Sequence, residues 1–279
     1  MSRNQNRLGG VQQHDTSPPP QQGGGGFSFV VPTEFIELPS QGRFYPEGHP
    51  LHGQESIEIR QMTAKEEDML TSRTLLKKGV ALDRVIASLI VDKAIDPDSL
   101  LVGDRNAIII ATRVSGYGNI YETKVTCPNC GTNQEYAFDL NEANVYDGAD
   151  ARDLGVRSNE DGTFNVTLPR TSVDVQFRLL NGRDEKTFVV GMQADKKAKS
   201  EKNITRQLAT IVVSLNGDSS IQAKQYFIDN VPSIDSRHLR LAYRLAAPNV
   251  DLTQQFVCGE CSHEQEMEVP LSADFFWSN

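Results

Sequence analysis

The sequence lacks the features that mark several large classes of protein. No apolar run approaches the roughly 20 residues that a membrane-spanning helix needs, and the N-terminus has no signal-peptide core. Basic residues are outnumbered, with 28 Lys and Arg against 37 Asp and Glu and a net charge of -9. That balance argues against a broad surface for nucleic acid or anionic membranes. We expect a protein of a reducing cytoplasm, with no membrane partner.

Motifs for catalysis are missing too. The chain contains no P-loop, no Rossmann glycine motif, no HExxH helix and no nucleophile elbow. Two of the five histidines, His49 and His52, fall in a Gly/Pro turn without a carboxylate cluster at ligand spacing. We therefore expect no enzymatic activity.

Cysteine is scarce, but its placement is informative. The only four cysteines form two pairs, Cys127-Pro128-Asn129-Cys130 and Cys258-Gly259-Glu260-Cys261. A gap of two residues lets both sulfurs of a pair reach one tetrahedral Zn²⁺. Cys127, Cys130, Cys258 and Cys261 are therefore candidate ligands of one zinc ion.

The flanks of the two pairs repeat at an offset of 131 residues. The offset relates Gln134 to Gln265 and Glu135 to Glu266, and apolar residues recur on both sides. Each half is predicted to be a strand, a cysteine knuckle and a second strand, as in a zinc ribbon. The repeat is imperfect, since Gly131 follows the first pair and Ser262 the second.

Three other interpretations of the cysteines are a redox dithiol, two separate disulfides and unrelated buried thiols. A thioredoxin-like motif would lie between a strand and a helix, whereas these pairs lie between strand-like segments. Four thiolates would complete the coordination shell, so the zinc would be structural. His263, beside the second pair, is then expected to be a bystander.

The predicted fold class is α+β, a helical body combined with β-hairpins and a split four-cysteine zinc ribbon. Residues 1–26 are a polar Pro/Gln/Gly tail, too poor in apolar residues to fold; the alternative is a tether that docks on a partner. Residues 27–279 are predicted to form one domain. Its ribbon is built from residues 119–140 and 250–271, with a helical segment at 63–116 and an inserted hairpin-plus-helices segment at 163–247.

Local patterns predict the elements of the helical segment. Alternation predicts a strand at residues 27–38 and another at Ile57 and Ile59. Thr63 and Glu66 fit a capping box at a helix start. Asp104 is predicted to cap a later helix that ends at Gly116.

The inserted segment starts after a turn-rich stretch, residues 139–161, that is predicted to be a loop. Alternating apolar residues from 164 to 179 predict a hairpin around residues 169–171. Four helices are predicted to follow. The first starts at Asn181 and Asp184, and the second is amphipathic and runs from Ile204 to Leu215, where Asn216-Gly217 ends it. The third runs from Ala223 to Asp229, and the fourth is capped by Asp235 and ends near Pro248.

Two groups of aromatic residues are candidates for contacts with a partner. Phe44 and Tyr45 lie in a turn-rich stretch, which either wraps the domain or presents both rings to a partner. Phe275, Phe276 and Trp277 lie near the C-terminus and either dock on their own domain or anchor a partner.

Six segments together resemble a known family. They are Leu38 to Pro46, Met62 to Leu70, Leu100 to Ile108, the first cysteine knuckle, Phe177 to Gly182 and Asp235 to Arg237. Over roughly Phe35 to Leu271 the chain resembles the baseplate hub assembly proteins of contractile-tailed, T-even-type bacteriophages.

This resemblance implies a non-enzymatic factor or component of the tail baseplate hub. It would act in the host cytoplasm by protein–protein contacts with other hub proteins or with the tape-measure protein. A stoichiometric baseplate subunit of the mature virion is one alternative. A zinc-ribbon nucleic-acid module is another, and the net charge opposes it.

Overall fold

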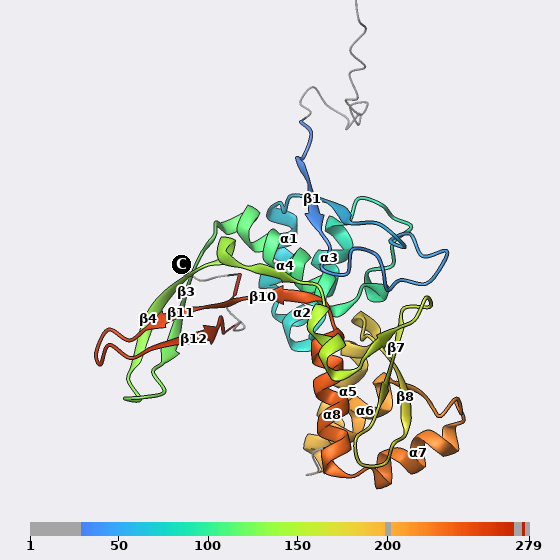
Figure 1. Ribbon diagram of the computed structural model, residues 1–279. Coiled ribbons are helices and arrows are strands. Elements are labelled where there is room, and N and C mark those ends of the chain that lie inside the picture. Colours follow the sequence, from blue (N-terminus) through green and yellow to red (C-terminus); the bar gives the residue numbers. More distant parts are fainter. Residues whose placement is uncertain (1–28, 199–201, 271–274, 277–279) are drawn as a thin grey trace, which may run out of the picture. The chain divides into compact units, whose positions relative to one another are not determined.

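Figure 1 shows the computed structural model, which describes residues 29–198, 202–270 and 275–276. Contacts divide the chain into two units, residues 1–32 and residues 33–279, and all the helices and strands belong to the second unit. The predicted tail at residues 1–26 lies outside the described residues, and the predicted domain division stays a prediction. Among the helices described, none is long and apolar enough to cross a bilayer.

The helical body follows a short hairpin, and the mixture of helices and hairpins agrees with the α+β prediction. Strand β1 pairs antiparallel with β2. The predicted capping box is confirmed, since Glu66 Oε2 accepts from the Thr63 backbone N–H (3.1 Å) and hydroxyl (2.7 Å). The elements are β1 (Thr33–Glu37), β2 (Ser56–Arg60), α1 (Ala64–Thr71), α2 (Arg73–Lys78), α3 (Ala81–Leu89), the 3₁₀ turn η1 (Pro97–Ser99) and α4 (Val102–Tyr117).

Two hairpins far apart in sequence carry the cysteines. The first consists of β3 (Ile120–Thr126) and β4 (Asn133–Asp139), and the second of β11 (Thr253–Val257) and β12 (Glu264–Glu268). The prediction of a loop over residues 139–161 is partly wrong, because β5 (Asn144–Tyr146) pairs with β10 (Asn249–Asp251). This stretch also contains η2 (Leu140–Glu142), η3 (Ala149–Leu154) and β6 (Arg157–Ser158).

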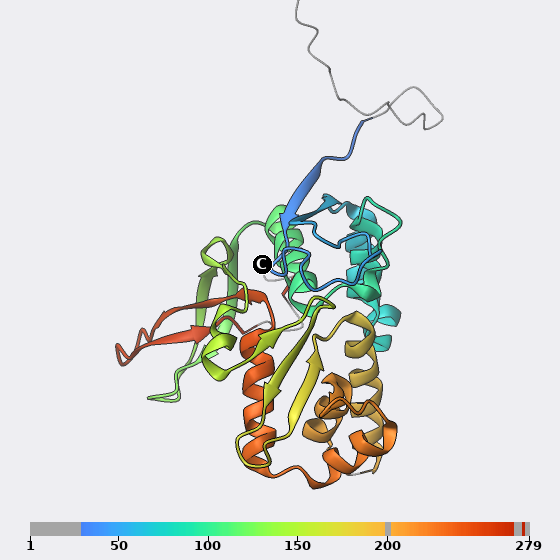
Figure 2. The same cartoon turned by 45° about the vertical axis from the view of Figure 1, so that its right-hand side comes forward.

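The inserted segment contains a four-stranded sheet in the order β6-β7-β8-β9 and four helices (Figure 2). The predicted hairpin is confirmed as β7 (Thr163–Thr167) and β8 (Asp174–Arg178). The helix predicted over Ile204–Leu215 is wrong at its end, because the chain leaves α6 (Asn203–Ile211) to form β9 (Val212–Leu215) on the edge of β8. The other helices are α5 (Gly182–Ala198), α7 (Ile221–Asn230) and α8 (Ser233–Ala246).

Two aspartates predicted to cap helices lie inside the first helical turn instead. Asp104 is the third residue of α4, and its carboxylate accepts from the hydroxyls of Ser40 and Tyr45, both at 2.7 Å. Asp235 is the third residue of α8 and accepts from the backbone N–H groups of residues 170 and 171 at 2.8 and 3.0 Å. Each carboxylate therefore fixes a distant loop rather than its own helix end.

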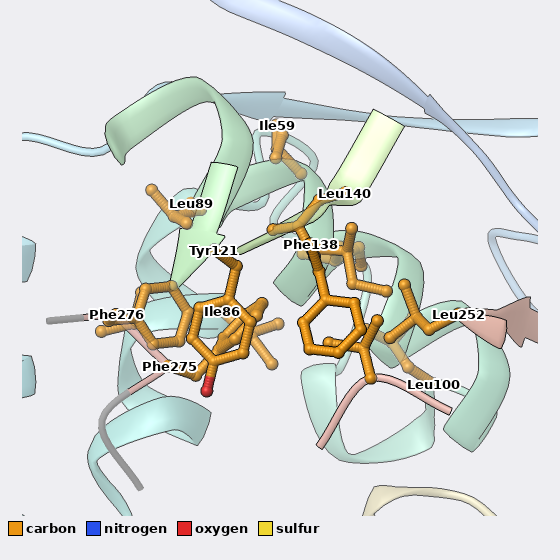
Figure 3. Packing of buried hydrophobic residues seen from close by; sticks show 14 of the residues in the cluster. Ile59, Ile86, Leu89, Leu100, Tyr121, Phe138, Leu140, Leu252, Phe275 and Phe276 are labelled. Carbon is orange, nitrogen blue, oxygen red and sulfur yellow. The ribbon is translucent and has the colours of Figure 1, made fainter. Parts of the chain in front are cut away.

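The buried apolar side chains form two clusters. One joins the helical body to the bases of the cysteine hairpins, where Tyr121, Phe138 and Leu252 meet Ile86 and Leu100 (Figure 3). The other fills the space between the four-stranded sheet and its helices. The cysteine hairpins are therefore part of the first cluster, which reaches as far as Cys127 and Cys258 in their turns.

Candidate metal centre

The two cysteine hairpins have the same internal register. Val125 pairs with Gln134 in the first, and Phe256, 131 residues after Val125, pairs with Gln265 in the second. The offset seen in the sequence is therefore an offset between equivalent positions of two β-hairpins. Strand β3 and β11 each lead into a cysteine turn, as a zinc ribbon requires.

The two turns also share their backbone hydrogen bonds. The N–H of Cys127 donates to Thr132 O at 2.9 Å, and the N–H of Cys258 donates to His263 O at 2.9 Å. A second bond closes each turn, to Cys127 O from the N–H of residue 131 (2.9 Å) and to Cys258 O from that of residue 262 (3.0 Å). Both knuckles thus hold their two sulfurs on the same side.

The mismatch after the second pair is absorbed by the backbone. Gly131 has a φ of 74° and Ser262 a φ of 53°, so both occupy the left-handed region. Glycine enters this region at little cost, and other residues at a cost of about 1–2 kcal/mol. Ser262 therefore takes the conformation that the knuckle demands.

All four sulfurs converge, with every pair within 4.8 Å. Cys127 Sγ lies 3.8 Å from Cys261 Sγ, and Cys130 Sγ lies 3.7 Å from Cys258 Sγ. Four thiolates at about 2.3 Å from a tetrahedral zinc would be about 3.8 Å apart. Sulfurs joined in a disulfide would be about 2.05 Å apart, so the arrangement fits a metal site and not disulfides.

Burial and hydrogen bonding differ between the four cysteines. Cys127 and Cys258 are buried, and Cys130 is exposed. Hydrogen bonding with Thr132, whose Oγ1 lies 3.4 Å from Cys130 Sγ, is the main cause that lowers the pKa of Cys130 to about 6. The thiolate is the form of cysteine that binds a metal, so this contact favours coordination at neutral pH.

Three polar residues that the sequence did not mark as part of the site connect the two hairpins. Gln134 Oε1 accepts from Gly259 N–H at 3.0 Å, and Asn129 Nδ2 lies 3.6 Å from Cys261 Sγ. Farther from the sulfurs, the Gln254 side chain makes two hydrogen bonds to the backbone of Asp139, at 2.7 and 3.2 Å. The only sequence signal for these contacts is the repeat of Gln134 at Gln265. The repeat does not show which of the two glutamines bonds to the other hairpin.

His263 does not belong to the cysteine cluster. Its ring Nε2 lies 3.3 Å from Gln265 Oε1, and its backbone oxygen closes the second knuckle. The structure thus gives His263 a role in the turn that needs no bond to a metal.

The aromatic residues predicted to contact a partner are mostly packed within the chain. The hydroxyl of Tyr45 is bonded to Asp104, and the ring of Phe44 lies 5.1 Å from that of Phe164. Phe275 and Phe276 are buried in the first cluster beside Tyr121 (Figure 3); Trp277 lies outside the described residues. Contact with a partner stays a prediction for these residues, and packing alone gives the four described rings a sufficient role.

Residues 32–277 match the family described as T4 bacteriophage base plate protein. The chain belongs to this family. No curated protein and no solved structure matches it. Both cysteine hairpins of this base plate protein lie within the matched residues, so the candidate metal centre is part of the matched region.

Proposed function

We propose that this base plate protein acts in building the tail baseplate hub, as an assembly factor or as a hub component, through contacts with other proteins and without catalysis. The match to the T4 base plate family over residues 32–277 is the observation that carries the proposal. The proposed partners are other hub proteins and the tape-measure protein. The proposed place of action is the host cytoplasm during assembly, and the virion tail thereafter if the protein is retained.

We further propose that Cys127, Cys130, Cys258 and Cys261 bind one structural Zn²⁺. The distances of 3.7 and 3.8 Å between their sulfurs support a single tetrahedral site. Four thiolates leave no open position for water or substrate, so zinc here would supply cross-linking rather than Lewis-acid chemistry. The ion would join two hairpins, each of which is only marginally stable as an isolated two-stranded sheet.

Two hairpins held together by four cysteines suit a protein on which other proteins assemble. Outside the sulfurs, the hairpins pack through the rings of Tyr136 and Phe256, whose centroids lie 5.0 Å apart, and through polar contacts such as Tyr136 Oη to Gln255 O at 3.0 Å. A metal bound by all four sulfurs would add a cross-link at the two turns to these contacts and would hold both turns in one orientation. A fixed pair of hairpins projecting from the helical body would then present one rigid surface to a partner.

Mass spectrometry of purified virions and of baseplate intermediates from infected cells tests the proposed function. A hub component is expected in both samples in a fixed ratio to the other hub proteins. An assembly factor is expected in the intermediates and in affinity pull-downs with hub proteins, but not in virions. Absence from both samples, together with pull-downs that recover no tail protein, would contradict the proposal.

A further inference from the structure

Strand β1 has an open edge. It pairs with β2 and with no other strand in the described part of the chain. The far side of β2 is covered, because Val91 N–H donates to Glu58 O at 3.2 Å and Ile59 forms a bridge with Ile90. β1 is therefore the free end of this small sheet, and it lies against α4 (Figure 2).

The register shows which backbone groups of β1 face the open edge. Leu38 N–H donates to Glu55 O at 2.8 Å, and hydrogen-bonded pairs alternate along an antiparallel ladder. Residues 34 and 36 therefore bond to β2, while the N–H and C=O groups of residues 33, 35 and 37 point outward. Glu58, opposite Phe35, sends its C=O to Val91, as this alternation requires. No hydrogen bond within the described residues satisfies the outward groups.

This edge lacks three of the devices that usually protect a free strand, although it carries another, the inward-pointing charge of Glu34. Lysine, proline and bulges are common on exposed edges because they block pairing with another chain. The five residues of β1 include none of these, and the ladder with β2 is regular. In addition, 70% of Phe35 is exposed. The edge is a template for one more strand.

A cavity of about 380 Å³ lies beside β1. Glu34 lines it together with apolar residues of α4, among them Ala107, Ile110 and Val114. The Oε1 atom of Glu34 is buried and has no hydrogen-bond partner. A buried carboxylate oxygen needs a donor, so this cavity is suited to an apolar side chain next to a cationic one.

We propose that β1 is extended by a strand of another base plate protein, which inserts an apolar side chain into this cavity and pairs a lysine or arginine with Glu34. Charge complementarity selects this occupant, because β1 carries Glu34 and Glu37 and no basic residue. Self-pairing about Phe35 would place Glu34 diagonal to Glu34 of the second copy, with no donor for either. The inference rests on the proposed function and names the chemistry of its partner.

A peptide titration of the full chain tests this proposal. The probe is a fluorescein-labelled heptapeptide in which threonine alternates with lysine, valine and lysine, so that the last three share one face. A control peptide has glutamate in place of both lysines. We expect anisotropy to report binding of the lysine peptide and at least threefold weaker binding of the glutamate peptide.

Variants of β1 distinguish the contribution of the backbone to peptide binding from that of the side chains. Phe35→Pro removes an outward N–H without touching a bond to β2 and is expected to weaken binding about tenfold. Phe35→Ala keeps that N–H and should change affinity less than threefold. Glu34→Gln should reduce the preference for the lysine peptide over the glutamate peptide. Amide hydrogen exchange in the unmodified chain gives a second measurement, in which the peptide should protect residues 35 and 37.

Several results would overturn the proposal: no binding of the lysine peptide, equal binding to Phe35→Pro, or unchanged exchange at residues 35 and 37. A dimer of the chain alone that Phe35→Pro dissociates would show that a second copy occupies the edge. These results concern β1 only. They are independent of whether virions or intermediates contain the protein, so failure here is distinguishable from failure of the proposed function.

Discussion

At the scale of single residues, the two knuckles have the same backbone conformation but different residues at the position after the second cysteine. Gly131 and Ser262 occupy equivalent positions, and both have positive φ. A Cβ on Gly131 would meet no atom within 4 Å, so a substitution there changes backbone strain and little else. Substitutions at residues 131 and 262 therefore measure the free-energy cost of the left-handed backbone conformation.

We predict that Gly131→Ala lowers the free energy of unfolding by about 0.5–1 kcal/mol, because the backbone strain of about 1–2 kcal/mol is partly offset by the lower entropy of the unfolded chain with alanine. By the same reasoning, Ser262→Gly should leave the free energy of unfolding unchanged or raise it slightly. Urea unfolding of the two variants beside the unmodified chain measures both effects. A larger loss from Ser262→Gly than from Gly131→Ala would contradict the assignment of the same backbone role to both residues.

Glu66 is predicted to make stability depend on pH. Burial raises the pKa of Glu66, but hydrogen bonds from Arg60 and Thr63 outweigh this effect and lower the pKa to about 2. A carboxyl group with a lower pKa in the folded state stabilises the fold above its usual value of 4.5 and loses this contribution as pH falls towards 2. The contribution is on the order of 2–3 kcal/mol.

Urea unfolding between pH 7 and pH 2.5 checks this expectation. Glu66→Gln should reduce stability at pH 7 and lose less than the unmodified chain on acidification. Glu67→Gln, at an exposed neighbouring position on the same helix, should keep the unmodified profile. If Glu66→Gln and the unmodified chain lose stability in parallel, the carboxylate does not have this role.

At the scale of elements, local sequence patterns located most helices and hairpins but not what holds them. Alternation predicted β7 and β8 because one face of this hairpin is buried. The same apolar stripe runs through α6 into Val212–Leu215, so only the open edge of β8 decides where the helix ends. Asp104 and Asp235 have the composition of helix caps, yet each bonds to a loop some 64 residues away, which no local pattern reveals.

The Asp235 contact with the β7–β8 turn yields a prediction for one element. Its two oxygens accept from the N–H groups of residues 170 and 171. Asp235→Asn replaces one acceptor with a donor, and we expect a loss of about 2 kcal/mol in unfolding free energy. Asp229→Asn, an exposed position on α7, is the matched control and should change stability by less than about 0.5 kcal/mol. Equal effects in chemical denaturation would remove Asp235 as the anchor of this turn.

At the scale of the whole molecule, the two hydrophobic clusters are joined where α4 and α5 begin. Gly182 N–H donates to Leu100 O and Val102 N–H donates to Leu180 O, both at 3.1 Å. Beside these bonds, Arg105 lies 2.8 Å from Asp83 and 3.0 Å from Glu185. The Arg105 side chain is 6% exposed, so these two carboxylates compensate a positive charge that water barely reaches.

We predict that Arg105→Ala lowers the free energy of unfolding by about 3 kcal/mol, because it leaves two carboxylates without their buried partner. Arg183→Ala is the control, since Arg183 pairs with Asp96 at a site where 65% of the arginine is exposed. We expect less than about 1 kcal/mol from that change. Similar losses of stability for both arginine variants would show that the ion pairs of Arg105 do not join the two hydrophobic clusters.

The four cysteines carry the central claim that one metal ion ties together hairpins 131 residues apart. Zinc content of the purified, reduced full chain, measured by elemental mass spectrometry, tests it most directly. We expect one zinc ion per chain, no bound zinc in Cys258→Ser, and a lower free energy of unfolding after chelation of the metal. A folded, reduced chain that contains no metal and keeps its stability in the presence of a chelator would contradict it.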